Sequence, residues 1–325
     1  MKKKSFDDLF VKLTGLDRPL PGSANFISLE KDTSDTNQAQ TNEVFSEKWT
    51  AYEKSEEKER CFEFQKNWYL SLYGFSSEKT LAAFLYDKNV IFDAGCGLGY
   101  KAAWFADLAP DSLVIGMDFS EAARLAAENY QQHPNLFFIR GDIADTTFPD
   151  GSIDYVSCDQ VIQHTENPEK TFAELTRITK KAGGEFACYF YAKKALPREL
   201  LDDYFRIQCS KMTLAELLEM SEQLTELGKR LSELRVIFDC PEIPALGIKG
   251  GAYDIQRFIY WNFLKCFWND QLGRETSIMT NYDWYSPSNA RRFSEEEVLE
   301  FVKKNSLSIA YFHREEACYS GRFVR

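Results

Sequence analysis

The stretch VIFDAGCGLGYKAAWFA, residues 90–106, joins an apolar run to an amphipathic run through three closely spaced glycines. Val90, Ile91 and Phe92 form a pattern typical of a short buried strand, and the alanines around Phe105 predict one face of a helix. Glycine adopts positive φ angles and lets another molecule approach the main chain closely. The stretch therefore predicts a strand, a turn that lies against a ligand and the N-terminus of a helix. An ordinary tight turn between a strand and a helix is the alternative.

The composition favours a globular protein that acts on small molecules. The chain has 325 residues, of which 44% are hydrophobic and 15% aromatic, enough to bury a large core. The formal net charge of −11 and the lack of a long Lys/Arg run disfavour nucleic acid as a partner. No segment is long and apolar enough to span a bilayer, so no membrane partner is expected. Residues 2–4 are three lysines, but no apolar run of a signal peptide follows them.

The cysteines indicate a reducing compartment. None of the eight belongs to a C-x-x-C pair, so a zinc ribbon is disfavoured and no metal site is expected. Several lie inside apolar runs, as buried free thiols do. Reduced cysteines without an export signal predict a cytoplasmic protein.

The chain divides by composition into five parts. Residues 1–44 are expected to form a tail and linker, and the aromatic-rich residues 45–87 a helical N-terminal segment. Over residues 88–192 five apolar strands alternate with helices, which predicts a parallel sheet covered on both faces. Residues 193–293 break this rhythm and are expected to form a largely helical cap inserted after strand five. Residues 294–325 then add a helix and two strands, which completes a seven-stranded α/β sheet.

Two helices are expected in the cap. Thr213 and Glu216 form a capping box at the start of the first. Its apolar residues recur every three or four positions: Leu217, Met220, Leu224, Leu227, Leu231 and Leu234. This spacing is typical of a coiled-coil-like seam and predicts packing against another helix of the cap, with a homodimer contact as the alternative. The second helix, residues 253–268, is apolar nearly all round and must be covered on two sides.

Acidic residues stand at three points of the expected α/β core. Asp93 precedes the first glycine by two residues in the pattern D-x-G-x-G-x-G, whereas nicotinamide and flavin enzymes favour G-x-G-x-x-G. Asp118 closes the second strand in GMDFS, and Asp142 follows the third in RGDIAD. Residues 147–186 then supply a fourth strand, its loop and a helix that ends at a Gly-Gly turn.

These motifs together resemble the class I S-adenosylmethionine-dependent methyltransferases over about residues 88–192. The resemblance implies a Rossmann-like methyltransferase sheet and S-adenosyl-L-methionine as the cofactor. It also implies an enzyme that transfers a methyl group to a small-molecule acceptor: a sugar, a nucleotide-sugar or a secondary metabolite. The FSEKW stretch before the core and the HT-x-NPE loop are similar to those of bacterial methyltransferases of cell-surface carbohydrate or secondary metabolism.

The family pattern implies a contact for each acid, since carboxylates accept charge-assisted hydrogen bonds. Asp118 is expected at the ribose hydroxyls, Asp93 at the methionine amino group, Asp142 with Ile143 at the adenine, and Asp159 at the methionine end. A helix cap for Asp118 and a turn for Asp142 are the structural alternatives. The expected cofactor-binding residues are Asp93, Gly95, Gly97, Asp118, Phe119, Asp142, Ile143 and Asp159.

His164 is the expected catalytic residue. Methyl transfer is an in-line displacement at a sulfonium, so the protein mainly positions and desolvates the reactants. His164 lies just past the fourth strand, where this family places groups near the transferring methyl, and an ordinary histidine pKa of about 6.5 suits a general base. A loop histidine that bonds to the backbone or packs on the substrate is the alternative.

Aromatic residues outside the core motifs are candidates for acceptor binding. Rings supply stacking faces, phenols supply hydrogen bonds, and an arginine binds phosphate or carboxylate. Packing in a core, and pairing of the arginine with an acid, are the alternatives. The expected substrate-binding residues are Tyr69, Tyr73, Arg257, Trp261 and Tyr285.

Three other functions are alternatives to this one. A transferase that uses a modified sulfonium cofactor and a non-catalytic S-adenosylmethionine-binding protein both share these motifs. A nicotinamide oxidoreductase is disfavoured by the glycine spacing. The acceptor, the methylated atom (O, N or C) and the oligomeric state are not determined by these patterns.

Overall fold

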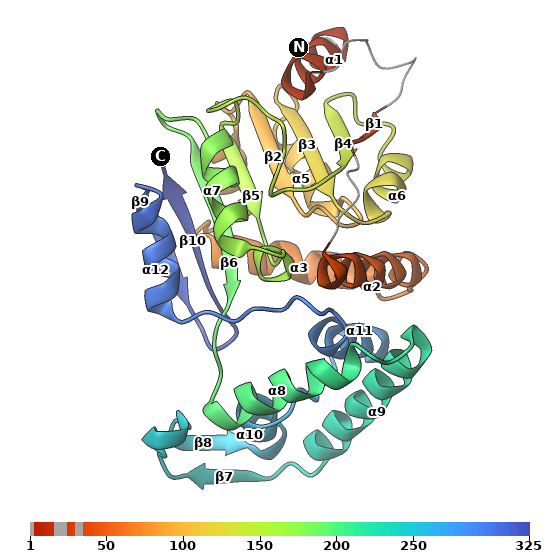
Figure 1. Cartoon of the computed structure of the whole chain (residues 1–325), viewed down its shortest axis with the longest axis vertical. Helices are drawn as coiled ribbons and strands as arrows, with labels where there is room; N and C mark the ends of the chain where they lie inside the picture. The colour runs from red at the N-terminus through yellow and green to blue at the C-terminus, as the bar shows by residue number, and fades with distance from the viewer. Residues whose placement is uncertain (1–2, 16–24, 30–34) are drawn as a thin grey trace. The chain divides into compact units, whose positions relative to one another are not determined.

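The computed structural model describes residues 3–15, 25–29 and 35–325, which form two compact units (Figure 1). The sheet unit comprises Met1–Ser34, Phe64–Tyr191 and Arg291–Arg325. The helical unit comprises Asp35–Glu63 and Ala192–Ala290. Most of the residues expected in the cap therefore lie in the helical unit, together with a segment from before the core; that this unit covers the sheet stays a prediction. Within the described residues, no helix is both long enough and apolar enough to cross a lipid bilayer.

A single sheet forms the centre of the sheet unit. Its described strands run in the order β1-β4-β3-β2-β5-β6-β10-β9. All neighbouring pairs from β1 to β6 are parallel, and β10 is antiparallel to both β6 and β9. The strands are β1 (Phe26–Ser28), β2 (Val90–Ala94), β3 (Leu113–Asp118), β4 (Leu136–Arg140), β5 (Tyr155–Cys158), β6 (Glu185–Tyr191), β9 (Ser308–Arg314) and β10 (Cys318–Val324). The α/β class with a mostly parallel sheet is confirmed.

The expected number of seven strands is wrong by one, because the described residues contain eight strands in this sheet. The additional strand is β1, which pairs in parallel with β4 at the edge, from Phe26 opposite Phe138 to Ser28 opposite Arg140. Helix α1 (Lys3–Thr14) also lies in the part expected to be a tail and linker. Other residues of that part, 16–24 and 30–34, lie outside the described residues. A three-residue edge strand is held by main-chain hydrogen bonds and therefore needs no apolar pattern in its sequence.

Helices cover both faces of the sheet, as the near-continuous apolar strands predict. On one face the core contains side chains from α1, α7 (Pro168–Ile178) and α12 (Glu295–Lys304). On the other it contains side chains from α4 (Glu78–Leu85), α5 (Tyr100–Leu108), α6 (Ala122–Asn129) and the end of α3 (Lys58–Leu72). Successive residues of β2 point to opposite faces, with Phe92 in the first cluster and Ile91 in the second.

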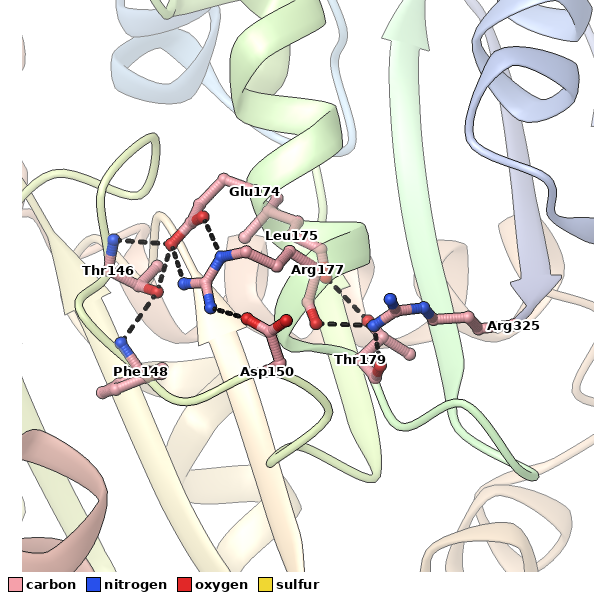
Figure 2. A network of polar contacts seen from close by, with 8 residues as sticks. All are labelled: Thr146, Phe148, Asp150, Glu174, Leu175, Arg177, Thr179 and Arg325. Atoms are coloured by element: carbon pink, nitrogen blue, oxygen red, sulfur yellow. Dashed lines mark hydrogen bonds and ion pairs between the residues drawn. The ribbon is translucent and has the colours of Figure 1, made fainter.

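The connection between β4 and β5 is fastened to α7 by a polar network (Figure 2). Arg177 on α7 donates to Glu174 at 2.7 Å and to Asp150 at 2.6 Å. Glu174 in turn accepts from the main-chain nitrogen and the hydroxyl of Thr146, at 2.9 and 2.6 Å. The C-terminal Arg325 donates to the carbonyl oxygen of Arg177 at 2.5 Å. These bonds position the start of β5, the strand that leads into Asp159.

Among the described residues, the helical unit contains five complete α-helices, two strands and a short 3-10 helix. Its helices are α2 (Thr36–Tyr52), α8 (Leu196–Cys209), α9 (Leu214–Glu233), α10 (Ile255–Asn262) and α11 (Arg274–Tyr285), and its strands β7 (Ile237–Cys240) and β8 (Gly251–Asp254) form an antiparallel pair. A one-turn 3-10 helix, η2 (Pro244–Leu246), lies between the strands. α2 packs on α11. Lys48 of α2 forms an ion pair of 2.7 Å with Asp283 of α11. All eight cysteines of the chain are buried free thiols.

The expected leucine seam of α9 differs from the face that the helix buries. Its buried residues are Leu217, Ser221, Thr225 and Gly228. A Cβ on Gly228 would lie 2.3 Å from the carbonyl oxygen of Cys266, so this glycine permits the close approach of another segment. Leu227 and Leu234 are 40% and 60% exposed. The small residues therefore make the tightest contacts of α9, and the homodimer contact through the leucines stays a prediction.

The second helix of the expected cap is shorter than predicted. α10 ends at Asn262, and residues 264–269 lie outside any helix or strand, whereas the apolar pattern predicted a helix up to Trp268. Asp254 caps its start by accepting from the main-chain nitrogens of Gln256 and Arg257 at 3.0 and 3.2 Å. Periodicity predicts the type of an element better than its end, because the end depends on tertiary partners.

The capping box of α12 allows a test of local stability. The Ser294 hydroxyl accepts from the main-chain nitrogen of Glu297 at 3.3 Å, and the Glu297 carboxylate accepts from that of Ser294 at 2.7 Å. Ser294→Ala is expected to lower the free energy of unfolding by about 1 kcal/mol, since a buried helix end loses its cap. Urea unfolding would measure it, with Ser294→Asp as the control that keeps a capping oxygen. Equal losses in both variants would contradict the capping role.

Candidate functional site

The glycine-rich turn forms as the sequence predicts, between β2 and α5. Gly95, Gly97 and Gly99 have φ angles of 77°, 51° and 79°, which side chains other than glycine rarely adopt. The main-chain nitrogens of Gly95 and Cys96 donate to the carbonyl oxygen of Met117 at 2.7 and 3.0 Å. The turn therefore lies against the carboxyl end of β3, next to Asp118.

Packing inside the protein accounts for two of these glycines. A Cβ on Gly95 would lie 2.3 Å from a methyl group of Val161, and a Cβ on Gly99 would lie 2.8 Å from Ala126 and from the Phe138 ring. The protein's own side chains thus require glycine at these positions, which the spacing alone did not reveal. That a cofactor also lies along the main chain of Gly95 and Gly97 stays a prediction.

The predicted acids meet at one edge of the sheet. Asp118 ends β3, and Asp142 and Asp159 follow β4 and β5 directly, while Asp93 is the fourth residue of β2. These four strands are neighbours and parallel, so their carboxyl ends share an edge. In open α/β sheets ligands bind at this edge, where the strand order reverses, here between β2 and β5.

Asp118 is held in a fixed orientation. Its Oδ2 accepts from the main-chain nitrogen of Gly97 at 2.9 Å, and its Oδ1 accepts from the nitrogen and the hydroxyl of Ser120 at 2.9 and 2.6 Å. An ionised carboxylate has about four acceptor positions, so one remains for a ligand hydroxyl. Asp118 thus ties the glycine turn to the end of β3. Phe119, next in the chain, is also partly exposed.

Asp118→Ala is expected to weaken the binding of S-adenosylmethionine by about 1.5–3 kcal/mol, the contribution of hydrogen bonds to a charged group. Calorimetric titration should show the same loss for the demethylated product, because both compounds carry the same ribose. Asp107→Ala, at an exposed position on α5, is the control. Unchanged affinity of the Asp118 variant would remove this residue from the ribose site.

A buried lysine that the sequence patterns did not reveal joins two of the acids. Nζ of Lys101, on α5, lies 3.3 Å from Oδ1 of Asp93 and 3.3 Å from Oδ2 of Asp159. The hydroxyl of Tyr73 donates to the other oxygen of Asp159 at 2.9 Å. All four side chains are at least nine-tenths buried. One cation between two carboxylates leaves a net negative charge at this edge.

Asp93 is the member of this group with unused hydrogen-bonding capacity. Neither of its oxygens accepts a hydrogen bond from the described residues, although Lys101 lies within ion-pair distance of one. Burial raises the pKa of Asp93 to about 6, against the opposing effect of Lys101. Burial opposes the charge of Lys101, but Asp159 and Asp93 together raise its pKa. A buried carboxylate oxygen without a donor fits a cationic amino group, such as that of the methionine part of the cofactor.

The segment after β5 carries the predicted catalytic residue. Gln160 has a φ of 64°, an uncommon angle for a residue with a side chain, and turns the chain into the 3-10 helix η1 (Ile162–His164). His164 is 7% exposed, and its ring lies 5.5 Å from the Tyr191 ring, edge to face. The amide of Gln163 is fully buried and has no hydrogen-bond partner among the described residues.

Asp142 and Ile143 form the turn after β4. Oδ1 of Asp142 accepts from the main-chain nitrogen of Ala144 at 2.8 Å, so the structural alternative, a turn residue, is present. Ile143 is 6% exposed and belongs to the core cluster of the sheet unit. A contact of either residue with adenine stays a prediction.

The expected substrate-binding residues lie in both units. In the sheet unit, the Tyr69 hydroxyl lies 2.6 Å from that of Tyr155, and Tyr73 bonds to Asp159. Both rings are buried in the core, and burial raises the pKa of both phenols. Their contact with an acceptor stays a prediction.

In the helical unit, the Tyr285 hydroxyl donates to Asp202 at 2.8 Å. The ring of Trp261 lies 5.3 Å from Nζ of Lys194. Arg257 donates to the carbonyl oxygen of Trp268 at 3.4 Å and pairs with no acid of the described residues. Acceptor binding by Arg257, Trp261 and Tyr285 also stays a prediction.

Comparison with known proteins agrees with this geometry. Residues 92–188 match a family described as "methyltransferase domain". Over 93 residues, 29% of this chain, the chain is 34% identical to a probable S-adenosylmethionine-dependent methyltransferase of Mycolicibacterium smegmatis and to trans-aconitate 2-methyltransferase of Deinococcus radiodurans. The match covers 35% and 34% of those proteins, so the chain spans about a third of the length of these curated relatives.

The solved structure of magnesium protoporphyrin IX methyltransferase from Synechocystis, with bound S-adenosylmethionine, is 13% identical to this chain. That comparison covers 91% of this chain and 100% of the other, with a TM-score of 0.46. The glycine turn and the four converging acids all lie within residues 92–188, the part of this chain that matches the methyltransferase domain.

Proposed function

We propose that this chain transfers the methyl group of S-adenosyl-L-methionine to a small-molecule acceptor. One observation carries the proposal: the buried carboxylate of Asp93 accepts no hydrogen bond from the described residues. It lies at the same edge of the sheet as the fixed carboxylate of Asp118, where parallel sheets bind ligands. The cofactor, when bound, supplies a methyl group on a positively charged sulfur. An edge with excess negative charge suits such a cation.

Each residue of the edge then has a defined task. Asp118, held by Gly97 and Ser120, accepts from a ribose hydroxyl with its remaining acceptor position. Asp93, with its orientation set by Lys101, accepts from the methionine amino group, while Asp159 shares the same lysine and is also bonded to Tyr73. Because these groups are already bonded within the protein, little side-chain entropy is lost when the ligand binds.

The remaining cofactor contacts are proposed from position. Asp142 and Ile143 lie beside the adenine at the end of β4, and Phe119 lies beside the ribose at the end of β3. The main chain of Gly95 and Gly97 lies along the cofactor.

We propose His164 as the general base for an acceptor that must lose a proton. His164 lies on η1, three residues after Val161, and Val161 packs against Gly95 of the glycine turn. This place near the turn supports the role. An acceptor whose nucleophilic atom holds no proton needs no base, so the methylated atom decides whether His164 acts. The buried amide of Gln163 is a further candidate for holding the acceptor.

The names of the relatives do not select one acceptor. Trans-aconitate and demethylmenaquinone, named in two of them, are chemically different molecules. The proposal is therefore a small organic molecule, with sugars, nucleotide-sugars and secondary metabolites as the classes to test first. Tyr69, Tyr73, Arg257, Trp261 and Tyr285 are its proposed contacts.

The test is a calorimetric titration of the full chain with S-adenosylmethionine, its demethylated product and NADH, followed by an assay for labelled methyl transfer to a panel of acceptors. Binding of both sulfur compounds and labelling of an acceptor are expected. Binding of NADH alone would refute the proposal. Tight binding without transfer to any acceptor would favour the non-catalytic alternative, and preference for a modified sulfonium would favour the other transferase.

A further inference from the structure

Lys265 in the helical unit is a buried cation without an anionic partner. Its side chain is 6% exposed, and no carboxylate of the described residues pairs with it. Lysine is almost never buried to this degree unless it is paired, because the loss of hydration must be compensated. The chain as a whole carries a formal charge of −11, so acidic residues are abundant. None of them pairs with Lys265 within the described part of the chain, which indicates that something else balances this charge.

Three aromatic rings surround the ammonium group. Nζ of Lys265 lies 4.5 Å from the ring centroid of Trp284, 5.4 Å from that of Tyr260 and 5.8 Å from that of Phe267. Ring faces attract a cation but accept its hydrogen bonds only weakly, whereas an ammonium group has three N–H donors. The rings therefore make burial tolerable and leave donors for a ligand.

A second cation shares the same rings. The guanidinium carbon of Arg257 lies 5.4 Å from the Tyr260 centroid and 5.7 Å from the Phe267 centroid. Within the described residues, its guanidinium donates one hydrogen bond, of 3.4 Å, to the main-chain carbonyl oxygen of Trp268. Arg257 is partly exposed, so a ligand can reach it from solvent.

The third cation of the group is already neutralised. Nε of Arg198 donates to Asp202 at 2.8 Å, and Asp202 also accepts from the Trp284 indole nitrogen at 2.7 Å. The aromatic–cation cluster thus holds three cations and one carboxylate, which leaves an excess of two positive charges. Its residues are Arg198, Asp202, Arg257, Tyr260, Lys265, Phe267 and Trp284.

Buried polar side chains hold the segment of residues 264–269, which carries Lys265. Its main-chain nitrogen donates to the Tyr285 hydroxyl at 3.1 Å, and Gln256 donates to the carbonyl oxygen of Cys266 at 2.8 Å. Asn281 accepts from the nitrogen of Phe267 at 2.7 Å and donates to its carbonyl at 3.1 Å. These bonds fix the main chain of a segment that belongs to no helix or strand. The position of Lys265 is therefore set before a ligand binds.

We propose that the aromatic–cation cluster binds a small organic molecule that carries a carboxylate or phosphate group. Lys265 and Arg257 contact the anionic group, and the rings pack against the apolar part of the molecule. A lysine binds such a group as a point charge, and an arginine adds directed hydrogen bonds.

The experiment titrates the full chain with benzoate, phenyl phosphate and benzyl alcohol at constant ionic strength, and follows tryptophan fluorescence and the melting temperature. Benzoate or phenyl phosphate should bind and raise the melting temperature, whereas neutral benzyl alcohol should bind at least ten-fold more weakly. The comparison of the two anions distinguishes a carboxylate site from a phosphate site.

Lys265→Met should weaken anion binding at least ten-fold. Lys229→Met is the matched control, since Nζ of Lys229 also lies over a ring, 5.6 Å from the Trp268 centroid, but is 44% exposed and 3.9 Å from Glu233. The control should leave binding unchanged. Arg257→Gln, at a partly exposed position, should weaken binding as well and serves if the Lys265 variant does not fold.

Equal binding by the Lys265 and Lys229 variants, or no binding of either anion by the wild type, would overturn the inference. A parallel titration with S-adenosylmethionine separates the two proposals. If the wild type binds S-adenosylmethionine but neither anion, only the proposed anion site is rejected. If the wild type does not bind S-adenosylmethionine, the proposed function is rejected instead.

Discussion

Replacing Lys101 by methionine is expected to lower the free energy of unfolding by about 3–5 kcal/mol near neutral pH, because two buried carboxylates then lose their shared cation. Asp93 and Asp159 each lie 3.3 Å from Nζ of Lys101, and none of the three side chains is more than slightly exposed. Methionine fills a similar volume, so the variant removes the charge and leaves the packing of α5 nearly intact.

Asp93 makes this loss depend on pH. Burial raises the pKa of Asp93 from 3.8 to about 6 in the folded protein. Between these values the folded state binds more protons than the unfolded state, so the contribution of Asp93 to stability decreases as the pH rises from about 4 to about 6. Without Lys101 the pKa of Asp93 rises further, and the protonated group no longer needs a cation. The deficit of the variant should therefore be smaller at about pH 5 than at about pH 7.5.

Urea unfolding at both pH values, followed by circular dichroism, would measure the deficit. Lys180→Met is the matched control, because Lys180 pairs with Asp154 but is 37% exposed and should cost only about 0–1 kcal/mol. Equal deficits of the Lys101 variant at the two pH values would contradict the account. So would a deficit no larger than that of the control.

The same variant tests the cofactor site without an acceptor. In the wild type, affinity for S-adenosylmethionine should fall as the pH drops below about 6, where Asp93 becomes protonated and loses its attraction for the amino group. In Lys101→Met the midpoint of this fall should move to higher pH. Lys101→Arg, which keeps a cation, should restore the wild-type midpoint. An affinity independent of pH in all three proteins would show that Asp93 does not contact the ligand.

Replacing His164 by glutamine is expected to lower turnover about 100-fold or more, the usual contribution of a general base, for an acceptor that loses a proton. Affinity for S-adenosylmethionine should change little, because the proposed cofactor contacts lie on other residues. The rate of the wild type should rise with pH as the imidazole loses its proton, and the variant should lose this dependence.

Initial rates of labelled methyl transfer, measured over a range of pH, would check this expectation. The chain has three histidines, and His133→Gln is the control, since His133 bonds to Asp107 on the surface of α5. Turnover of the His164 variant equal to that of the control would remove His164 from the mechanism. A loss confined to cofactor affinity would instead make it a binding residue.

Several features followed from short stretches of sequence, because their causes are local. The turn of residues 95–99 needs positive φ angles, which favour glycine. The capping boxes at Thr213 and Ser294 depend on residues three positions apart, and both are present. Parallel strands follow from apolar runs separated by helices, and that order places the ends of β2 to β5 at one edge.

Other features depended on residues far apart in the chain. Strand β1 exists because residues 26–28 meet β4 more than a hundred positions later, and its three residues carry no pattern of their own. Gly95 is required by Val161, and Gly228 by Cys266. In sequence, such a glycine cannot be distinguished from one that contacts a ligand.

By itself the sequence determined the class of fold and the acids at the ends of the strands, since these depend on local backbone preferences and on the order of strands and helices. Only the tertiary structure decided which charges are paired. Lys101 and Lys265 both occur as ordinary polar residues in the chain, yet one lies between two carboxylates and the other among three rings. The electrostatic role of a lysine depends on its burial and on neighbours brought near by folding, and neither is encoded within a short stretch.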